Sequence, residues 1–337
     1  MTFSWMSTNI PKRPTLEELI SGIIRGDRVA LARGITLVES KLPSDRALAE
    51  QLIDRLLSKT GKATRIGVSG IPGVGKSTFI EAFGVHLTRL GKKVAVLAVD
   101  PSSKQTKGSI LGDKTRMNKL AVNPNAYIRP TPTGSTLGGV ADQSREAMLL
   151  CEAAGFDVIL IETVGVGQSE TLVRDMCDFF LLLTIAGAGD DLQGIKKGIM
   201  EMADAIVINK ADGDNIPVVK KTLQELKQVV HYFSLPPSGW VTQVTTCSAL
   251  LGEGIGELWI LIESFNEKMT ANGYLAHQRS QQNLQWMHQK LDGLLKQEFN
   301  RLVKEEVKDL AAKVENRELN PVTAAHQLFD LYKKKKG

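Results

Sequence analysis

The sequence predicts a doubly wound α/β fold, in which a mostly parallel sheet is covered by helices on both faces and extended by N- and C-terminal α-helical regions. Three observations lead to this prediction. Short, nearly continuous apolar runs alternate with helical stretches between residues 63 and 272. A glycine-rich loop follows the first of these runs. The segments on either side of this region have apolar residues at helical spacing.

Residues 1–62 are predicted to form an N-terminal helical region. Thr15 followed three residues later by Glu18 is the pattern of a capping box at a helix start. Gly26 and Asp27 together indicate a stop and a restart, and Pro43 begins a further helix.

Seven apolar runs in residues 63–272 are predicted to be strands. Because several of them are apolar almost throughout, we expect strands that are buried on both faces of the sheet. Their ranges are 65–69, 93–99, 127–129, 158–161, 179–184, 205–208 and 242–246.

Residues 273–337 are predicted to form a C-terminal helical arm. Leu291, Leu295, Phe299 and Leu302 lie at three- and four-residue steps and so share one helical face. That face could fold back on its own domain or pack against a second copy of the chain. We favour a homo-oligomer, because the predicted sheet is complete without the arm.

The composition is that of a globular protein, with 42% hydrophobic and 23% charged residues among 337. The net charge is +5, but lysines 333–336 contribute four of these charges, and a solvated chain end is the simpler interpretation of that run. We therefore expect no nucleic-acid partner. Cys151, Cys177 and Cys247 form no C-x-x-C pair, which favours a reducing compartment, the cytoplasm. No apolar stretch approaches the length of a membrane span.

Residues 70–77 match the phosphate-loop pattern G-x-x-x-x-G-K-[ST], with a predicted strand before them and a helical stretch after them. Glycines let backbone N–H groups converge on phosphate oxygens, and the helix N-terminus adds favourable partial charge. Lys76 is expected to reach the β- and γ-phosphates, and the Ser77 hydroxyl to bind Mg²⁺. The alternative is a chance glycine-rich turn. The predicted nucleotide contacts are Gly70, Ile71, Pro72, Gly73, Val74, Gly75, Lys76, Ser77 and Thr78.

A second motif, Asn209-Lys210-Ala211-Asp212, follows the predicted strand 205–208 and has the N-K-x-D pattern that reads guanine. The Asp212 carboxylate can accept hydrogen bonds from both N1–H and the exocyclic amino group of guanine, a donor pair that adenine lacks. Asn209 is expected to orient the loop, and the Lys210 stem to lie over the base. After the next strand, Ser248, Ala249 and Leu250 resemble the S-A-x element that contacts guanine. Each motif could instead be an ordinary polar turn at the end of a strand.

Three carboxylates complete the predicted site. Glu162 ends the strand that begins at Val158 and lies three residues before Gly165, giving E-x-x-G where most GTPases have D-x-x-G. Its carboxylate is expected to hold Mg²⁺ or a water on it. Asp100 follows another strand and Asp113 lies further along, so both are candidates for holding that ion's water or the attacking water. Either aspartate could equally be a turn former or a helix cap.

Together these motifs resemble the branch of P-loop GTPases that carries glutamate in the third nucleotide motif. More narrowly, the chain resembles the MeaB/ArgK/methylmalonic aciduria type A subfamily. The matching stretches are 70–78, 99–103, 108–117, 162–170, 187–198 and 209–212. The helical ends fit as well, because members of that subfamily carry an N-terminal helical region and a C-terminal arm that makes a homodimer.

The resemblance implies a GTPase chaperone that gates cofactor loading and protects or reactivates adenosylcobalamin-dependent methylmalonyl-CoA mutase. It implies Mg²⁺ as cofactor, with GTP or GDP as the bound nucleotide. By analogy Asp100 and Asp113 belong to a first switch, Glu162 to a second, and residues 190–197 to a third that faces the mutase. Lys76, Asp100, Asp113 and Glu162 are then the expected catalytic residues, and Ser77 with the three carboxylates the expected metal ligands.

Two other functions remain open at this point. An older label for the subfamily is a kinase linked to lysine/arginine/ornithine transport. A metallochaperone GTPase is the second alternative, although such relatives usually carry His-rich tracts or cysteine clusters, and this chain has five scattered histidines.

Overall fold

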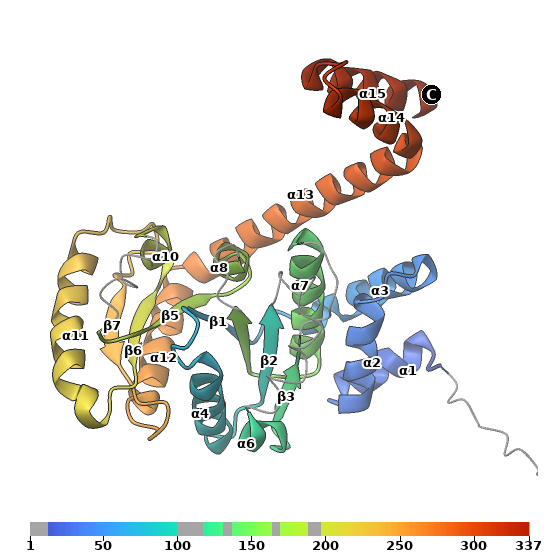
Figure 1. Cartoon of the computed structure of the whole chain (residues 1–337). Coiled ribbons are helices and arrows are strands. Elements are labelled where there is room, and N and C mark those ends of the chain that lie inside the picture. The colour runs from blue at the N-terminus through green and yellow to red at the C-terminus, as the bar shows by residue number, and fades with distance from the viewer. Residues whose placement is uncertain (1–12, 100–116, 131–136, 164–168, 188–196, 337) are drawn as a thin grey trace, which may run out of the picture. The chain divides into compact units, whose positions relative to one another are not determined.

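The structure is a computed structural model that describes residues 13–99, 117–130, 137–163, 169–187 and 197–336 (Figure 1). The strands are β1 (Thr64–Gly70), β2 (Val94–Val99), β3 (Ala126–Arg129), β4 (Val158–Thr163), β5 (Phe179–Ile185), β6 (Ala205–Asn209) and β7 (Gln243–Thr246). The helices are α1 (Leu16–Ile24), α2 (Arg28–Val38), α3 (Pro43–Leu56), α4 (Lys76–Arg89), α6 (Asn118–Ala121), α7 (Leu137–Ala153), α8 (Ser169–Arg174), α10 (Lys197–Met202), α11 (Ile216–His231), α12 (Ile255–Ala271), α13 (Tyr274–Leu302), α14 (Lys304–Glu315) and α15 (Pro321–Lys336), with short 3₁₀ turns η1 (Leu57–Lys59) and η2 (Gly213–Asn215).

The seven strands form one sheet in the order β3-β2-β4-β1-β5-β6-β7, and every neighbouring pair is parallel. All seven predicted strands are present, and their predicted bounds differ from the observed ones by at most two residues. The central strand β1 lies between β4 and β5. Because all strands run the same way, the loops that leave their carboxyl ends lie along one edge, where ligands bind in open α/β sheets.

Helices cover both faces of the sheet, as the doubly wound prediction requires. One face packs on α4 and α12 in a core that includes Ile66, Val68, Phe79, Phe83 and Phe265. The strands turn their alternate residues to the opposite face, where they meet α7 and α8.

The core on that opposite face extends into the N-terminal helices. Ile161 and Phe180 of the sheet share one buried cluster with Ile23, Ile35 and Leu52 of α1, α2 and α3. The three helices also contact α7. The helices before β1 therefore pack on the sheet domain through the same core.

The predicted helix starts in this region are confirmed. Thr15 Oγ1 accepts a hydrogen bond from the Glu18 N–H (3.3 Å), and the Glu18 carboxylate accepts one from the Thr15 N–H (2.7 Å), which completes the capping box. Asp27 caps α2 by accepting from Val29 N at 2.7 Å and Ala30 N at 3.0 Å.

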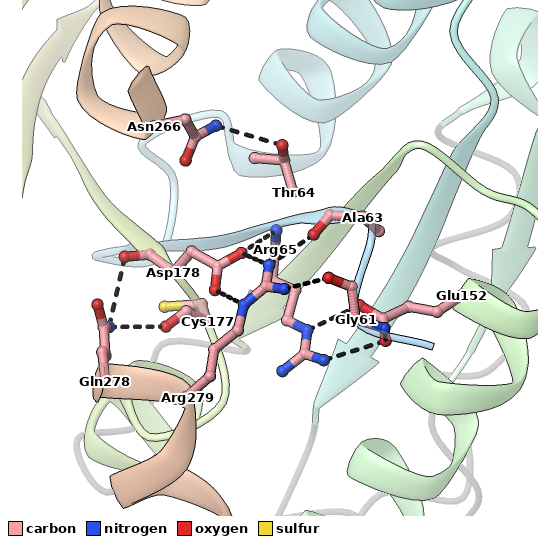
Figure 2. A network of polar contacts seen from close by, with 10 residues as sticks. All are labelled: Gly61, Ala63, Thr64, Arg65, Glu152, Cys177, Asp178, Asn266, Gln278 and Arg279. Carbon is pink, nitrogen blue, oxygen red and sulfur yellow. Dashed lines mark hydrogen bonds and ion pairs between the residues drawn. The ribbon is translucent and has the colours of Figure 1, made fainter. Parts of the chain in front are cut away.

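A buried ionic network joins the elements at the amino ends of β1 and β5 (Figure 2). Arg65, in β1, forms a bidentate pair with Glu152 near the end of α7, with Nε–Oε1 and Nη2–Oε2 distances of 2.9 and 3.0 Å. Glu152 also accepts from Gly61 N at 2.7 Å. The Arg65 backbone N–H donates to Asp178 (2.8 Å), whose carboxylate is fully buried. These contacts lie at the edge of the sheet opposite to the phosphate loop.

Contacts between residues divide the chain into a unit that ends at Arg279 and a second unit that begins at Ser280. The predicted boundaries at residues 62 and 272 remain predictions. Within the second unit, the ring of Tyr332 in α15 packs at a tilt against the ring of Phe299 in α13, with centroids 5.3 Å apart. None of the helices in the described ranges is both long and apolar enough to cross a membrane.

The lysine run at 333–336 forms the last turn of α15, where the prediction was a solvated chain end. Lys335 lies 2.5 Å from the Glu306 carboxylate, and Lys336 lies 3.4 Å from Glu298. Lys333 lies 4.4 Å from the centroid of the Phe329 ring. Cations at a helix C-terminus also interact favourably with the helix dipole. Acidic neighbours on α13 and α14 therefore neutralise part of this run.

Candidate functional site

The phosphate-loop residues 70–77 connect the end of β1 to the start of α4, as predicted. Two glycines of the loop are held against neighbouring strands. A side chain at Gly70 (φ +154°) would place its Cβ 2.5 Å from the Leu183 carbonyl oxygen. One at Gly75 (φ +93°) would lie 2.8 Å from Asn209 Nδ2. Only glycine allows this backbone path at such close approach.

Lys76 is the first residue of α4, and its ammonium lies over the loop. Its Nζ donates to the carbonyl oxygens of Gly70 (2.6 Å) and Ile71 (3.2 Å). Burial lowers the pKa of Lys76 below its ordinary value, while the negative charges of Glu162 and Glu170 raise it. The predicted phosphate-binding lysine therefore lies close to two carboxylates. One of them, Glu170 in the first turn of α8, lies in the matching stretch 162–170 but was not predicted as a site residue.

Glu162 is the penultimate residue of β4, its side chain is almost fully buried, and it faces the start of α4. The Ser77 hydroxyl donates to Glu162 Oε1 at 3.4 Å. A hydroxyl and a carboxylate in contact are hard oxygen ligands of the kind that Mg²⁺ prefers. The residues present thus fit the predicted ion, and Ser77 and Glu162 are the two described residues that would hold it.

The other predicted ligands, Asp100 and Asp113, lie outside the described residues, as do residues 190–196 of the predicted third switch at 190–197. In the ranges that the structure describes, no group of three or more His, Cys, Asp or Glu side chains is placed to hold a metal ion.

Asn209 joins three loops at the carboxyl edge of the sheet. It ends β6 and is 2% exposed. Its Nδ2 donates to the Val74 carbonyl in the phosphate loop (2.9 Å), and its Oδ1 accepts from Ala249 N (3.1 Å). Lys210, which has φ +58°, extends its Nζ to the Gly73 carbonyl at 3.0 Å. The expected orienting role of Asn209 is therefore supported by direct contacts to both neighbouring loops.

Asp212 and Ser248 are in direct contact, since the Ser248 hydroxyl donates a short hydrogen bond to Asp212 Oδ2. Ser248 is fully buried and also accepts from Leu251 N at 3.1 Å. The serine thus fixes the carboxylate that is predicted to read the base. Leu250 is 79% exposed, so its side chain takes no part in this cluster, and any contact with the base would come from its backbone.

The structure therefore brings the described members of the predicted site together along one edge of the sheet. They are Gly70–Thr78, Glu162, Asn209, Lys210, Asp212, Ser248, Ala249 and Leu250. Their roles in binding and catalysis are not observed directly and remain predictions.

Comparison with known proteins gives consistent matches over most of the chain. A family model described as "Methylmalonyl Co-A mutase-associated GTPase MeaB" matches residues 31–304. The GTPase ArgK of Escherichia coli (strain K12) is 49% identical over 322 residues, which cover 94% of this chain and 96% of that protein. The mouse protein "Methylmalonic aciduria type A homolog, mitochondrial" is 44% identical over 330 residues, covering 94% and 80% of the two chains. The crystal structure of an LAO/AO transport system kinase has a TM-score of 0.75 at 42% identity, covering 95% of this chain and 98% of that one.

Proposed function

The chain belongs to the MeaB family of GTPases, and from this premise we propose that it is a chaperone of adenosylcobalamin-dependent methylmalonyl-CoA mutase. It would use the GTP cycle to gate cofactor loading and to protect or reactivate the mutase. The single observation that supports a guanine-dependent switch best is the position of Asn209. Its amide contacts Val74 in the phosphate loop and Ala249 in the predicted base loop. One side chain thus connects the two ends of a nucleotide site.

We assign the predicted residues to roles in nucleotide binding. The Asp212 carboxylate would accept the two donors of guanine while Ser248 holds it in place. Backbone N–H groups of residues 70–78 would surround the phosphates, and Lys76 would exchange its carbonyl partners at Gly70 and Ile71 for phosphate oxygens. The Lys76 ammonium would then interact with a charged phosphate in place of two carbonyl dipoles, which favours the nucleotide-bound state.

Hydrolysis would then be in-line attack of water on the γ-phosphate. Lys76 would stabilise the charge that develops on the transferred phosphoryl group. Ser77 and Glu162, with Asp100 and Asp113, would hold Mg²⁺, which neutralises phosphate charge when it is bound. Glu162 would keep its ligand oxygen in place because it is buried and in contact with Ser77.

We further propose that the chain is a homodimer assembled through α13. Among the 29 residues of this helix none is buried. Leu284, Met287, Leu291 and Leu294 are each between 44% and 55% exposed, and their spacing of three, four and three residues is that of a coiled-coil seam. Such a continuous apolar stripe on a helix is a surface that a second copy would cover. A cytoplasmic location is proposed as well, supported by three buried cysteines that form no disulfide among the described residues.

The partner proposal can be tested with purified components. The full-length protein would be mixed with methylmalonyl-CoA mutase in GDP and in a non-hydrolysable GTP analogue, and complex formation followed by sedimentation. We expect the affinity for the mutase, and the rate of adenosylcobalamin loading into the apo-mutase, to differ between the two nucleotides. A mutase that binds in neither state, or loads identically in both, would overturn the chaperone proposal.

The transport-kinase alternative is favoured by one observation, the name of the similar solved structure. It makes a different prediction for the γ-phosphate of GTP. A kinase leaves labelled phosphate on a protein, whereas the proposed chaperone releases all of it as inorganic phosphate. Denaturing electrophoresis of a reaction with γ-labelled GTP therefore separates the two functions.

A further inference from the structure

A second polar contact links the strands that carry the phosphate loop and Glu162. The Thr163 hydroxyl donates to Ser69 Oγ at 3.0 Å, and the two side chains are 0% and 1% exposed. Ser69 immediately precedes Gly70, and Thr163 immediately follows Glu162. A buried hydroxyl is costly unless it is hydrogen-bonded, and this bond gives the Thr163 donor an acceptor in Ser69 Oγ.

This contact lies on the face of the sheet opposite to Ser77 and Glu162. In β4, Glu162 points to the same face of the sheet as Leu160, which packs in the same core as α4. Thr163 points to the opposite face with Ile161, towards α8. In β1, Ser69 lies on the same face as Gly67, and a Cβ at Gly67 would lie 2.7 Å from Val173 of α8. The carboxyl ends of β1 and β4 are therefore held on one face by Ser77–Glu162 and on the other by Ser69–Thr163.

From this arrangement we infer that Ser69 and Thr163 are positioning residues, which set the place of Glu162 relative to the phosphate loop for Mg²⁺-dependent hydrolysis. The inference rests on the proposed function. Val68 pairs with Glu162 in the register of β1 and β4, and each of the two strands ends within two residues of that pair. Beyond this point β1 and β4 no longer pair with each other, because Ser69 and Gly70 pair only with β5 and Thr163 pairs only with Val99 of β2. The Thr163–Ser69 hydrogen bond therefore links the two backbones directly where β1 and β4 stop pairing with each other.

Strand formation alone does not need these hydroxyls, because valine has an equal or higher strand preference than threonine. Thr163→Val keeps size, branching and burial and removes only the hydrogen bond. Thr184, near the end of the neighbouring strand β5, provides a matched control. Its side chain is 1% exposed, and its hydroxyl has no hydrogen-bond partner among the described residues. Thr184→Val therefore makes the same chemical change at a similar level of the sheet without breaking a contact.

The experiment measures metal affinity without turnover as well as hydrolysis. Mn²⁺ binding to the GDP complex is followed by electron paramagnetic resonance, and GTP hydrolysis is measured against Mg²⁺ concentration. Loss of a group that orients a metal ligand typically costs about 10- to 100-fold in affinity. We expect Thr163→Val and Ser69→Ala each to weaken Mn²⁺ binding by about 10-fold or more, with GDP binding in EDTA changed by less than about 2-fold.

Three further results are expected. Thr163→Ser restores the wild-type metal affinity, Thr184→Val leaves it unchanged, and the double variant of Ser69 and Thr163 is no worse than either single one, because one bond is lost in each case. Unchanged Mn²⁺ affinity in both single variants, or an equal loss in Thr184→Val, would overturn the inference. If Thr163→Val does not fold, Ser69→Ala with Thr163→Ser provides the same test. A wild-type protein that hydrolyses GTP without Mg²⁺ would instead contradict the proposed function.

Discussion

Arg279, in the second turn of α13, forms a bidentate ion pair with Asp178, the residue before β5 (Figure 2). Nε lies 2.7 Å from Oδ1, and Nη2 lies 2.6 Å from Oδ2. The same guanidinium donates to the carbonyl oxygens of Gly61 (2.6 Å) and Ala63 (2.7 Å). Asp178 also accepts from the backbone N–H of Arg65. One planar cation therefore fixes the start of α13 to the segment before β1 and to β5.

Replacing Arg279 with methionine should lower the free energy of unfolding by about 3–5 kcal/mol, because it leaves Asp178 as a buried charge that has lost its cation. The matched control is Arg55→Met. Arg55 makes a similar bidentate pair with Glu17, but both side chains are more than half exposed and solvent screens the pair, so we expect a much smaller loss. Urea denaturation of both full-length variants measures the difference. Equal losses of unfolding free energy in the two variants would show that the buried ion pair stabilises the fold no more than the exposed one.

The local features of this fold could be predicted from sequence because they depend on neighbours along the chain. The capping box at Thr15 and the strand at 158–163 each follow from a few consecutive residues. The same is true of the phosphate loop and of Asn209–Asp212, whose residue types and spacing are dictated by the ligand. Parallel strand direction then places their ends along one edge of the sheet.

Other features could not be predicted, since they depend on partners far apart in sequence. Asp178 and Arg279 are separated by 101 residues, and Ser69 and Thr163 by 94. Neither pair belongs to a motif, and arginine, aspartate, serine and threonine occur throughout the surface of proteins. The pairing of the terminal lysines with Glu298 and Glu306 has the same origin. The four lysines are exposed, as a solvated run predicts, but the run alone could not show which acidic side chains folding brings to it.

Charge placed in the apolar stripe of α13 should dissociate the proposed dimer. Leu291→Glu puts a carboxylate at the centre of the stripe, where burial in a dimer would cost several kcal/mol, so we expect a shift towards monomer in sedimentation velocity. Lys296→Glu is the control, because position 296 is exposed and lies on the opposite side of the same helix. GTP hydrolysis by the isolated protein serves as the check on folding. A monomeric wild type, or identical sedimentation of both variants, would argue against this interface.

The buried thiols should make stability fall at alkaline pH. Desolvation raises the pKa of Cys177 and of Cys247 to about 12, above their ordinary value. At alkaline pH the unfolded thiols lose protons that the folded state keeps. The contribution of the thiols to the free energy of unfolding is therefore complete below the pKa of the unfolded thiol, and it declines as pH rises towards the pKa of the folded one. We expect the urea midpoint to fall between pH 8 and 10, and to fall less steeply in Cys177→Ala, which lacks one titrating group. Equal slopes in the two proteins would contradict the assignment.

Replacing Asp212 with asparagine should change which base the site accepts. The asparagine side chain offers an amide donor in place of one carboxylate oxygen, so it loses one of the two acceptors for guanine and gains a donor for the 2-keto group of xanthine. We expect GTP affinity to fall by at least about 100-fold, the equivalent of about 3 kcal/mol for a lost charged hydrogen bond. Affinity for xanthosine triphosphate should rise, and hydrolysis of that nucleotide should approach the wild-type rate with GTP.

Ser248→Ala separates reading of the base from positioning of the carboxylate. This variant keeps the Asp212 carboxylate but removes the hydroxyl that donates to it. GTP affinity should fall by about 10-fold, as expected for one lost hydrogen bond, without any gain for xanthosine triphosphate. Fluorescent-nucleotide titrations of the two variants test both expectations in one series. If Asp212→Asn retains the GTP preference of the wild type, the base is read elsewhere, and the contact between Ser248 and Asp212 is only structural.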